Sequence, residues 1–420
     1  MYEKISKEKC VVQKYGGTSV GDISRITMVA RRIHKFHSQG WKKLAIVVSA
    51  MSGETNRLVA LMKEVHPSGR PSTKSYDMTV SAGEQVSVGL MAAALEAQGV
   101  SSEPFLGYQV GIFTDESHGQ AKIQSIRTEA IENAWQRGAI PIIAGFQGVT
   151  ENLEITTLGR GGSDLSAVAL AAALKASFCE INTDVEGVYT ADPRYVPKAK
   201  LLEELDYETA LELAASGGKV LHSRCVEVGA KYQVPIVVRS SFLPDEGRKT
   251  VIMSFNAENA LEAPVVSAIS LDQNVSKITV KGVPAGGVTL SSVFSKVAEK
   301  GVNVDIIVHD RQNNDDKDRF GFTVQKEDVS IAISAIESLR NQRGFEQLST
   351  EVQNDLAKVS AVGLGMRSHS GVANRAFGSL TQSGIDILMI STSEIKISCV
   401  VHKTNGQRAA QVLHDTFFSN

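Results

Sequence analysis

The stretch Thr156-Thr157-Leu158-Gly159-Arg160-Gly161-Gly162-Ser163-Asp164 is the most informative part of this chain, because a glycine-rich turn opens an apolar helix there. Glycines let the backbone approach a ligand closely, since no Cβ stands in the way. Ser163 is expected to cap the helix, whose N-terminus favours an anion. Arg160 offers a planar fork of donors to a carboxylate or phosphate. With Asp164 nearby, the turn indicates a site for a small molecule carrying both a carboxylate and an ammonium; the alternative is an ordinary capped turn.

A second glycine turn lies near the N-terminus. The strand-like run Cys10-Val11-Val12-Gln13-Lys14 leads into Tyr15-Gly16-Gly17-Thr18-Ser19, and an apolar-periodic helix with Asp22 as its cap follows. The lysine precedes the glycines, which excludes a Walker A loop, and the spacing is not that of a dinucleotide-binding turn. Its amide groups and the Lys14 ammonium still predict a phosphate cradle. The alternative is a plain strand–helix turn with a surface lysine.

A third polar segment, Asn182 to Arg194, follows the short apolar strand Phe178-Cys179-Glu180-Ile181. Long connections without regular structure are usually functional or disordered, and the tyrosine and valines of this segment argue against disorder. We expect five of its side chains to enclose a nucleoside and its phosphates: Thr183, Asp184, Tyr189, Asp192 and Arg194. The alternative is a surface loop with Asx turns.

The composition limits the classes of function. The 420 residues predict two or three domains, and the net charge of −2 carries no basic excess, so nucleic acid is disfavoured as a partner. No apolar run is long enough for a membrane helix and the charged N-terminus is unlike a signal peptide, which predicts a cytoplasmic protein. Four scattered cysteines predict buried free thiols rather than disulfides or a metal site.

Strand-like and helix-like segments alternate from residue 10 to residue 254. This order predicts a mostly parallel sheet covered by helices on both faces, with ligands at the carboxyl ends of its strands. The glycine turns and the polar segment described above are all expected to follow the carboxyl ends of such strands. The expected strands are 44–49, 140–144 and 234–238, and the expected helices are 79–98, 123–136, 164–175 and 222–232.

An internal repeat begins after about Ala263. Lys277–Val280 resembles Lys358–Val362, Val302–Ile307 resembles Ile385–Ile390, and Phe320–Val324 resembles Ile397–Val401. Each copy predicts a ferredoxin-like βαββαβ unit, similar to a tandem of ACT domains. The alternative is that the two copies only pair subunits.

The three polar segments, by their order and spacing, resemble the signature segments of the aspartokinases (aspartate kinases). The resemblance runs from Val11 to about Phe417 and implies three domains: an amino acid kinase-like catalytic domain at 1–254 and ACT regulatory domains at 264–345 and 346–420. It also implies transfer of the ATP γ-phosphoryl group to the side-chain carboxylate of L-aspartate, the first step of lysine, threonine and methionine biosynthesis. Mg²⁺ is expected to arrive with ATP, held mainly by the phosphates.

The resemblance assigns roles residue by residue. Lys14, Arg160 and Asp164 are the expected catalytic residues. The expected ATP contacts are Lys14, Tyr15, Gly16, Gly17, Thr183, Asp184, Tyr189, Asp192, Arg194 and Lys219. Arg160 would bind the α-carboxylate of aspartate and Glu84 the α-ammonium, with the other aspartate contacts at Ser49, Thr55, Gly161, Gly162 and Ser163.

Feedback binding of lysine or threonine to the ACT repeats is a further hypothesis, as is assembly into at least a dimer through them. The candidate effector contacts are Asp305, Gly371, Val372, Asp386, Ser393 and Glu394. The first repeat departs from the family pattern, because its turn Pro284-Ala285-Gly286-Gly287 lacks an adjacent Pro-Gly. The alternatives in function are a glutamate, acetylglutamate, carbamate or uridylate kinase, and an amino-acid sensor with an inactive kinase domain.

Overall fold

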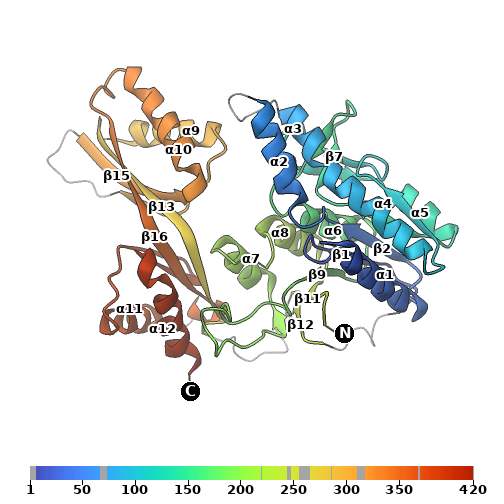
Figure 1. Cartoon of the computed structure of the whole chain (residues 1–420). Coiled ribbons are helices and arrows are strands. Elements are labelled where there is room, and N and C mark those ends of the chain that lie inside the picture. The colour runs from blue at the N-terminus through green and yellow to red at the C-terminus, as the bar shows by residue number, and fades with distance from the viewer. Residues whose placement is uncertain are drawn as a thin grey trace. The chain divides into compact units, whose positions relative to one another are not determined.

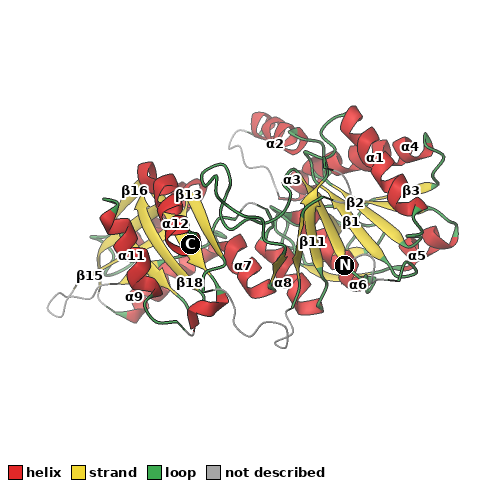
Figure 2. Cartoon of the chain, turned by 90° about the horizontal axis from the view of Figure 1, so that it is seen from below, coloured by secondary structure: helices red, strands yellow, loops and turns green. Residues whose placement is uncertain are grey.

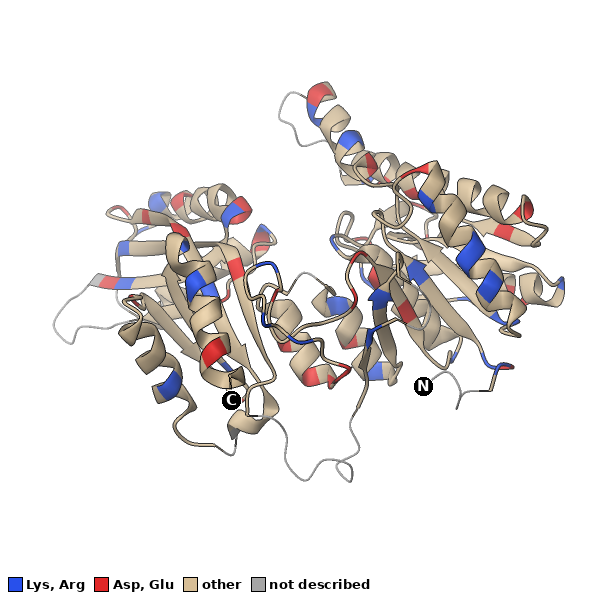
Figure 3. Ribbon diagram, turned by 60° about the horizontal axis from the view of Figure 1, so that its bottom comes forward, with Lys and Arg blue, Asp and Glu red and all other residues tan. Residues whose placement is uncertain are grey.

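The structure is a computed structural model that describes residues 6–66, 73–218, 220–243, 247–254, 265–284, 286–309, 317–367 and 369–419. The chain divides into two compact units (Figure 1). The first unit comprises residues 1–189, 200–215 and 219–261, and the second comprises 190–199, 216–218 and 262–420. Basic and acidic residues are interspersed along the ribbon of each unit (Figure 3). None of the helices in the described ranges has both the length and the apolar character needed to cross a bilayer.

The first unit is built on an eight-stranded sheet, which confirms the expected mostly parallel architecture. All neighbouring strands are parallel except β11 and β12. In spatial order the strands are β10 (Glu204–Leu205), β12 (Lys249–Ile252), β11 (Ile236–Ser240), β9 (Cys179–Thr183), β1 (Val11–Tyr15), β2 (Leu44–Val48), β6 (Ile140–Ala144) and β3 (Ser102–Phe105). Strands β1, β2, β6 and β11 are buried throughout, because helices cover both faces of the sheet.

Helices α1 (Ile23–Ser38) and α4 (Ala82–Glu96) pack on one face of the sheet, and α6 (Gly162–Ala173), with α8 (Ser223–Tyr232) against it, covers the other (Figure 2). The other helices of the first unit are α2 (Glu54–Val65), α3 (Thr73–Val80), α5 (Glu129–Gln136) and α7 (Tyr207–Ala215). Asp22 caps α1 as expected, accepting a hydrogen bond from the Arg25 amide at 2.8 Å. The single helix expected over 79–98 is instead α4 preceded by the end of α3.

A smaller four-stranded sheet corrects two expectations. Its order is β5 (Ile123–Ile126), β4 (Ile112–Thr114), β7 (Gln147–Val149) and β8 (Ile155–Thr157). The helix expected over 123–136 begins only at Glu129, because the residues before it pair antiparallel with β4. The turn that carries Arg160 leaves β8 and therefore does not leave the main sheet. Tertiary pairing overrides the local pattern in both cases.

The second unit contains one six-stranded sheet with helices α9–α12. The strand order is β14 (Ile307–His309), β15 (Lys317–Gln325), β13 (Ala268–Pro284), β16 (Ser349–Val362), β18 (Lys396–His402) and β17 (Met389–Thr392). The helices are α9 (Gly287–Glu299), α10 (Val329–Glu337), α11 (Val372–Gln382) and α12 (Gly406–Phe418). The expected strand–helix–strand–strand–helix order occurs twice. The runs expected as second strands, 302–307 and 385–390, become strands only at Ile307 and Met389.

The strands β13 and β16 run through both repeats. The first half of β13, Ala268 to Asp272, pairs with Lys358 to Val362, and its second half pairs with β15 and with the start of β16. Each repeat therefore completes its sheet with a strand segment from the other. The domain boundaries at 254, 264 and 345/346 stay predictions about sequence segments.

All four cysteines are free and buried, as the sequence predicts. Burial raises the pKa of the Cys10 and Cys399 thiols to about 12, because a thiolate would be poorly solvated there. These thiols behave as small apolar core groups.

Candidate active site

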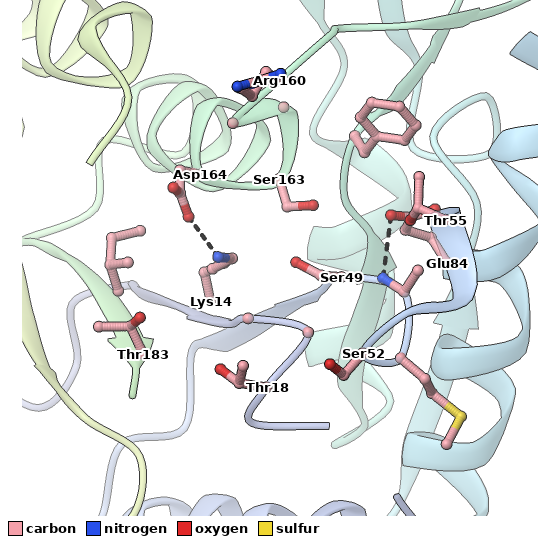
Figure 4. Close-up of a pocket in the computed structure, with 18 of the residues that line it drawn as sticks. Lys14, Thr18, Ser49, Ser52, Thr55, Glu84, Arg160, Ser163, Asp164 and Thr183 are labelled. Carbon is pink, nitrogen blue, oxygen red and sulfur yellow. Dashed lines mark hydrogen bonds and ion pairs between the residues drawn. The ribbon is translucent and has the colours of Figure 1, made fainter. Parts of the chain in front are cut away.

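A cavity of about 510 Å³ opens where β1, β2 and β9 end and where α2 and α6 begin (Figure 4). Lys14 comes from β1, Glu84 from α4 and Asp164 from α6. Thirteen of the expected site residues line this cavity: Lys14, Gly16, Gly17, Ser49, Thr55, Glu84, Arg160, Gly161, Gly162, Ser163, Asp164, Thr183 and Asp184. Segments distant in sequence thus meet around one space.

Lys14 is held by a carboxylate of α6. Its Nζ lies 2.5 Å from Asp164 Oδ1, and the two side chains are 10% and 14% exposed. The distance defines an ion pair between Lys14 and Asp164. The two groups are not aligned as a hydrogen bond, because Asp164 Oδ1 has no partner that satisfies hydrogen-bond geometry. Side chains alternate along a strand, so Tyr15 packs into the core on the α1 face while Lys14 faces α6. The sheet therefore fixes the base of the lysine and Asp164 orients its ammonium.

Two glycines after β1 bring the backbone close to the cavity. A Cβ on Gly17 would lie 2.9 Å from the Ala50 carbonyl oxygen, and one on Gly16 would lie 3.3 Å from Lys14 Nζ. No larger residue fits Gly17 without movement of the backbone after β2. The glycine pair therefore keeps the loops after β1 and β2 in contact and leaves the lysine ammonium uncovered.

Two helices present uncapped N-termini to the cavity. Helix α2 begins after Gly53 (φ 82°) and α6 after Gly161 (φ 70°), and neither residue supplies a side-chain cap. The expectation that Ser163 caps α6 is therefore wrong: the helix begins two residues earlier than expected, at Gly162, because Gly161 accepts the left-handed conformation at the cap. Free amides and the helix dipoles make both ends favourable to anions.

Glu84 is a buried carboxylate at the wall of the cavity. It is 3% exposed, and its Oε1 accepts a hydrogen bond from the Ala50 amide at 3.1 Å. Its Oε2 is buried without a hydrogen-bond partner among the described residues. Burial raises the pKa of Glu84 to about 7. A cation that entered the cavity would satisfy this oxygen and stabilise the charged form.

Arg160 is exposed on a turn that its neighbours fix firmly. The Leu158 amide donates to the Phe146 carbonyl at 2.9 Å, and the Arg224 guanidinium donates to the Leu158 carbonyl and, at 2.8 Å, to the Ala121 carbonyl. A Cβ on Gly161 would lie 2.3 Å from His222 Cβ, so the turn packs directly on α8. The exposed guanidinium of Arg160 is thereby carried on a fixed backbone.

Several expected nucleotide contacts lie outside the lining of the cavity. Tyr15 is fully buried and its hydroxyl donates to Gln13 at 3.2 Å. The Tyr189 hydroxyl donates to Glu186 at 2.7 Å, and Arg194 forms an ion pair with Asp192 at 2.6 Å. Lys219 lies outside the described residues.

The second unit contains its own cavity of about 560 Å³ beside α11. Four expected effector contacts line it: Gly371, Val372, Ser393 and Glu394. Asp305 forms an ion pair with the buried Lys358 instead, and Asp386 is exposed outside the lining.

Sequence reasoning missed some lining residues of the first cavity: Thr18, Ala50, Met51, Ser52, Gly53, Phe146, Gly159, Ile181 and Val220. Gly53 carried a usable signal, because a glycine directly before an amphipathic helix is a possible uncapped start. No signal in the sequence predicted Phe146, because its position in the cavity depends on β6 ending at the same edge of the main sheet as β2. In the described ranges, no group of three or more His, Cys, Asp or Glu side chains is placed to hold a metal ion.

Comparisons with known proteins identify the family of this chain. The amino acid kinase family model matches residues 9–240, and an ACT domain model matches residues 359–417. An aspartate kinase of Stutzerimonas stutzeri is 44% identical over 407 residues, 97% of each chain. Escherichia coli aspartokinase III with aspartate and ADP (R-state) matches with a TM-score of 0.81 at 26% identity, over 98% of this chain and 100% of that one. Its complex with lysine and aspartate (T-state) matches with a TM-score of 0.73 at 26% identity, over 99% and 100%.

Proposed function

Because this chain belongs to the amino acid kinase family, and within it to the aspartate kinases, we propose that it transfers the γ-phosphoryl group of MgATP to the side-chain carboxylate of L-aspartate. The products are 4-phospho-L-aspartate and ADP. One observation carries the choice of substrate: Glu84 is a buried carboxylate with an unpaired oxygen, in a cavity that Arg160 and Lys14 also line. An amino acid with a second carboxylate supplies a charge partner to each of these groups.

The amino acid lies, in this proposal, between Glu84 and Arg160. Glu84 Oε2 accepts from the α-ammonium, and the Arg160 guanidinium binds the α-carboxylate as a planar fork. Ser49 and Thr55, beside the free N-terminus of α2, orient the side-chain carboxylate. That carboxylate is already ionised at neutral pH, so the transfer requires orientation rather than a strong base.

In the transfer step a side-chain carboxylate oxygen of aspartate attacks the γ-phosphorus. The new P–O bond forms as the bond to the β,γ-bridging oxygen breaks, and ADP leaves with that electron pair. Charge spreads over the transferring group, so cations and amides are the useful catalysts. Lys14, oriented by Asp164, and the amides of Gly16 and Gly17 supply them. Mg²⁺ arrives with ATP and is held mainly by the phosphates, as is usual for this ion.

Removal of the Lys14 ammonium tests the proposal. Lys14→Ala is expected to lose on the order of 10²–10³-fold in kcat, as for one preorganised charge contact. A coupled assay of ADP release measures turnover with aspartate, glutamate and UMP offered separately, and hydroxylamine traps the acyl phosphate that forms when the acceptor is a carboxylate. Turnover with glutamate but not aspartate would overturn the substrate, and near-normal turnover by the variant would overturn the role of Lys14. Turnover with none of the three would leave the sensor alternative and the acetylglutamate and carbamate kinase alternatives.

We also propose feedback binding of lysine or threonine at the cavity of the second unit. Helix α11 starts after Gly371 (φ 89°) without a side-chain cap, so free amides can receive an α-carboxylate, and Glu394 on the same cavity can receive an ammonium. Calorimetric titration with lysine, with threonine and with both checks this, and Glu394→Gln is expected to weaken binding. No heat in any titration removes the proposal. Pairing of subunits through this unit and a cytoplasmic location also stay predictions.

A further inference from the structure

Asp77, on α3, is fully buried, yet it does not line the active-site cavity. Three donors surround its carboxylate. The Thr157 hydroxyl donates to Oδ1 at 2.6 Å, and the Gly119 amide at 3.0 Å and His118 Nδ1 at 2.9 Å donate to Oδ2. A carboxylate only accepts, so the imidazole proton is placed on Nδ1. A buried charge with this many hydrogen bonds is a strong structural tie.

The tie joins three segments that are far apart in sequence. Asp77 belongs to the helix that ends two residues before α4, and α4 carries Glu84. Thr157 is the last residue of β8 and precedes Arg160 by three residues. The third segment, around Gly119, supports the same turn, because the Ala121 amide donates to the Thr157 carbonyl at 2.9 Å.

Further charges fix the outer side of the tie. His118 Nε2 lies 3.4 Å from Glu154 Oε2, and Glu154 forms an ion pair with Lys74 at the start of α3. The histidine side chain is only 5% exposed, so its ring is held between the two carboxylates. Asp77 is thus braced from α3, from the 115–121 loop and from the hairpin of β7 and β8.

We propose that Asp77, through Thr157 and His118, is a positioning residue that sets the spacing between Glu84 and Arg160. This rests on the proposed function, in which these two groups hold the α-ammonium and the α-carboxylate. Both substrate groups sit on one carbon atom, so their protein partners must keep a fixed separation. A misplacement of about 1 Å can cost on the order of 10²-fold in such sites. We expect such a displacement to weaken the binding of the amino acid. The binding of ATP is expected to stay unchanged, because its proposed contacts lie on the loops after β1 and β9.

Thr157→Val tests the inference, since it removes the hydroxyl at nearly constant volume. We expect the KM for aspartate to rise about tenfold with the KM for ATP unchanged, from a displacement smaller than the 1 Å case. Thr157→Ser, which keeps the hydroxyl, is expected to restore the KM. His118→Phe is a second route to the same effect, because it removes the donor to Oδ2 and leaves Thr157 intact.

Thr156→Val is the matched control. Thr156 is the neighbouring residue on β8, is equally buried and pairs its hydroxyl with Thr114 at 2.7 Å, so the variant loses a buried hydrogen bond without touching Asp77. If the Asp77–Thr157 contact has only a structural role, Thr157→Val and Thr156→Val will lose Tm and active fraction equally, and their KM for aspartate will be unchanged. This result would overturn the inference. If Thr157→Val does not fold, His118→Phe with an unchanged KM for aspartate overturns it. A wild-type protein without aspartate turnover would instead reject the proposed function.

Discussion

At the scale of single residues, Glu84 shows how burial prepares a group for a ligand. Its pKa of about 7 lies well above the ordinary 4.5, because the apolar side of α4 and the floor of the cavity desolvate the carboxylate. The folded protein therefore holds a proton that the unfolded chain has lost between about pH 4.5 and pH 7. Stability falls as pH rises through this window, by on the order of 3 kcal/mol from this group.

The pH dependence of aspartate use follows from this carboxylate. The ionised form binds the α-ammonium, so kcat/KM for aspartate should rise with pH through about 7. Glu84→Gln should have a low kcat/KM without this rise, and above pH 7 it should be at least as stable as the wild type, because no buried charge remains. Steady-state rates and Tm from pH 5.5 to 8.5 check both. A wild-type profile that is flat across pH 7, or is retained in the variant, contradicts the assignment.

At the scale of elements, the N-terminal ends of α2 and α6, at Gly53 and Gly161, contribute more to the cavity than the rest of these helices does. Both glycines have positive φ and neither supplies a side-chain cap. The first amides, of Glu54 and Gly162, donate to the Met51 and Gly159 carbonyls, so an anion in the cavity would meet the amides that follow them in the first turn. An L-residue with a side chain costs roughly 1–2 kcal/mol in this conformation. The positions of these two helix ends therefore define where anions bind.

Gly161→Ala is predicted to damage activity as well as stability. Besides the cost of positive φ, the new methyl group would meet His222 Cβ at 2.3 Å, so the Arg160 turn must move away from α8. We expect a loss of at least tenfold in kcat/KM for aspartate, in line with the displacement of a binding group. Gly99→Ala is the control, because Gly99 has a similar φ of 74° with open space around it. Equal activities of the two variants would contradict the packing explanation.

At the scale of the whole molecule, the second unit is stabilised by strands that its two repeats share. β13 contributes to the apolar core around Leu380 and to the one around Phe322, and β16 contributes to the first core and pairs with β13 along both halves. A strand cannot lose its pairing in one half without loosening the register in the other. The two repeats are therefore expected to unfold as one cooperative unit.

Leu380→Ala tests this cooperativity. The side chain is fully buried on α11, and its truncation should cost about 2–5 kcal/mol. Hydrogen exchange is expected to quicken in α9 and α10 of the first repeat as well as in α11 and α12. Leu388→Ala is the control, since Leu388 is 37% exposed. Quickened exchange confined to residues 349–419 would show that the repeats unfold separately.

The sequence by itself determined the parallel sheet, the doubled repeat and the three polar segments of the site. Local periodicity and glycine turns are encoded within about twenty residues, so Lys14 and Arg160 could be named without coordinates, whereas Glu84 was named only from the resemblance to the aspartokinases. Only the tertiary structure decided that Ile123–Ile126 is a strand, that β8 belongs to a second sheet and that β13 and β16 serve both repeats. The same holds for the Asp77–Thr157 contact, which joins residues 80 positions apart. Such contacts depend on long-range pairing and burial, which no local pattern contains.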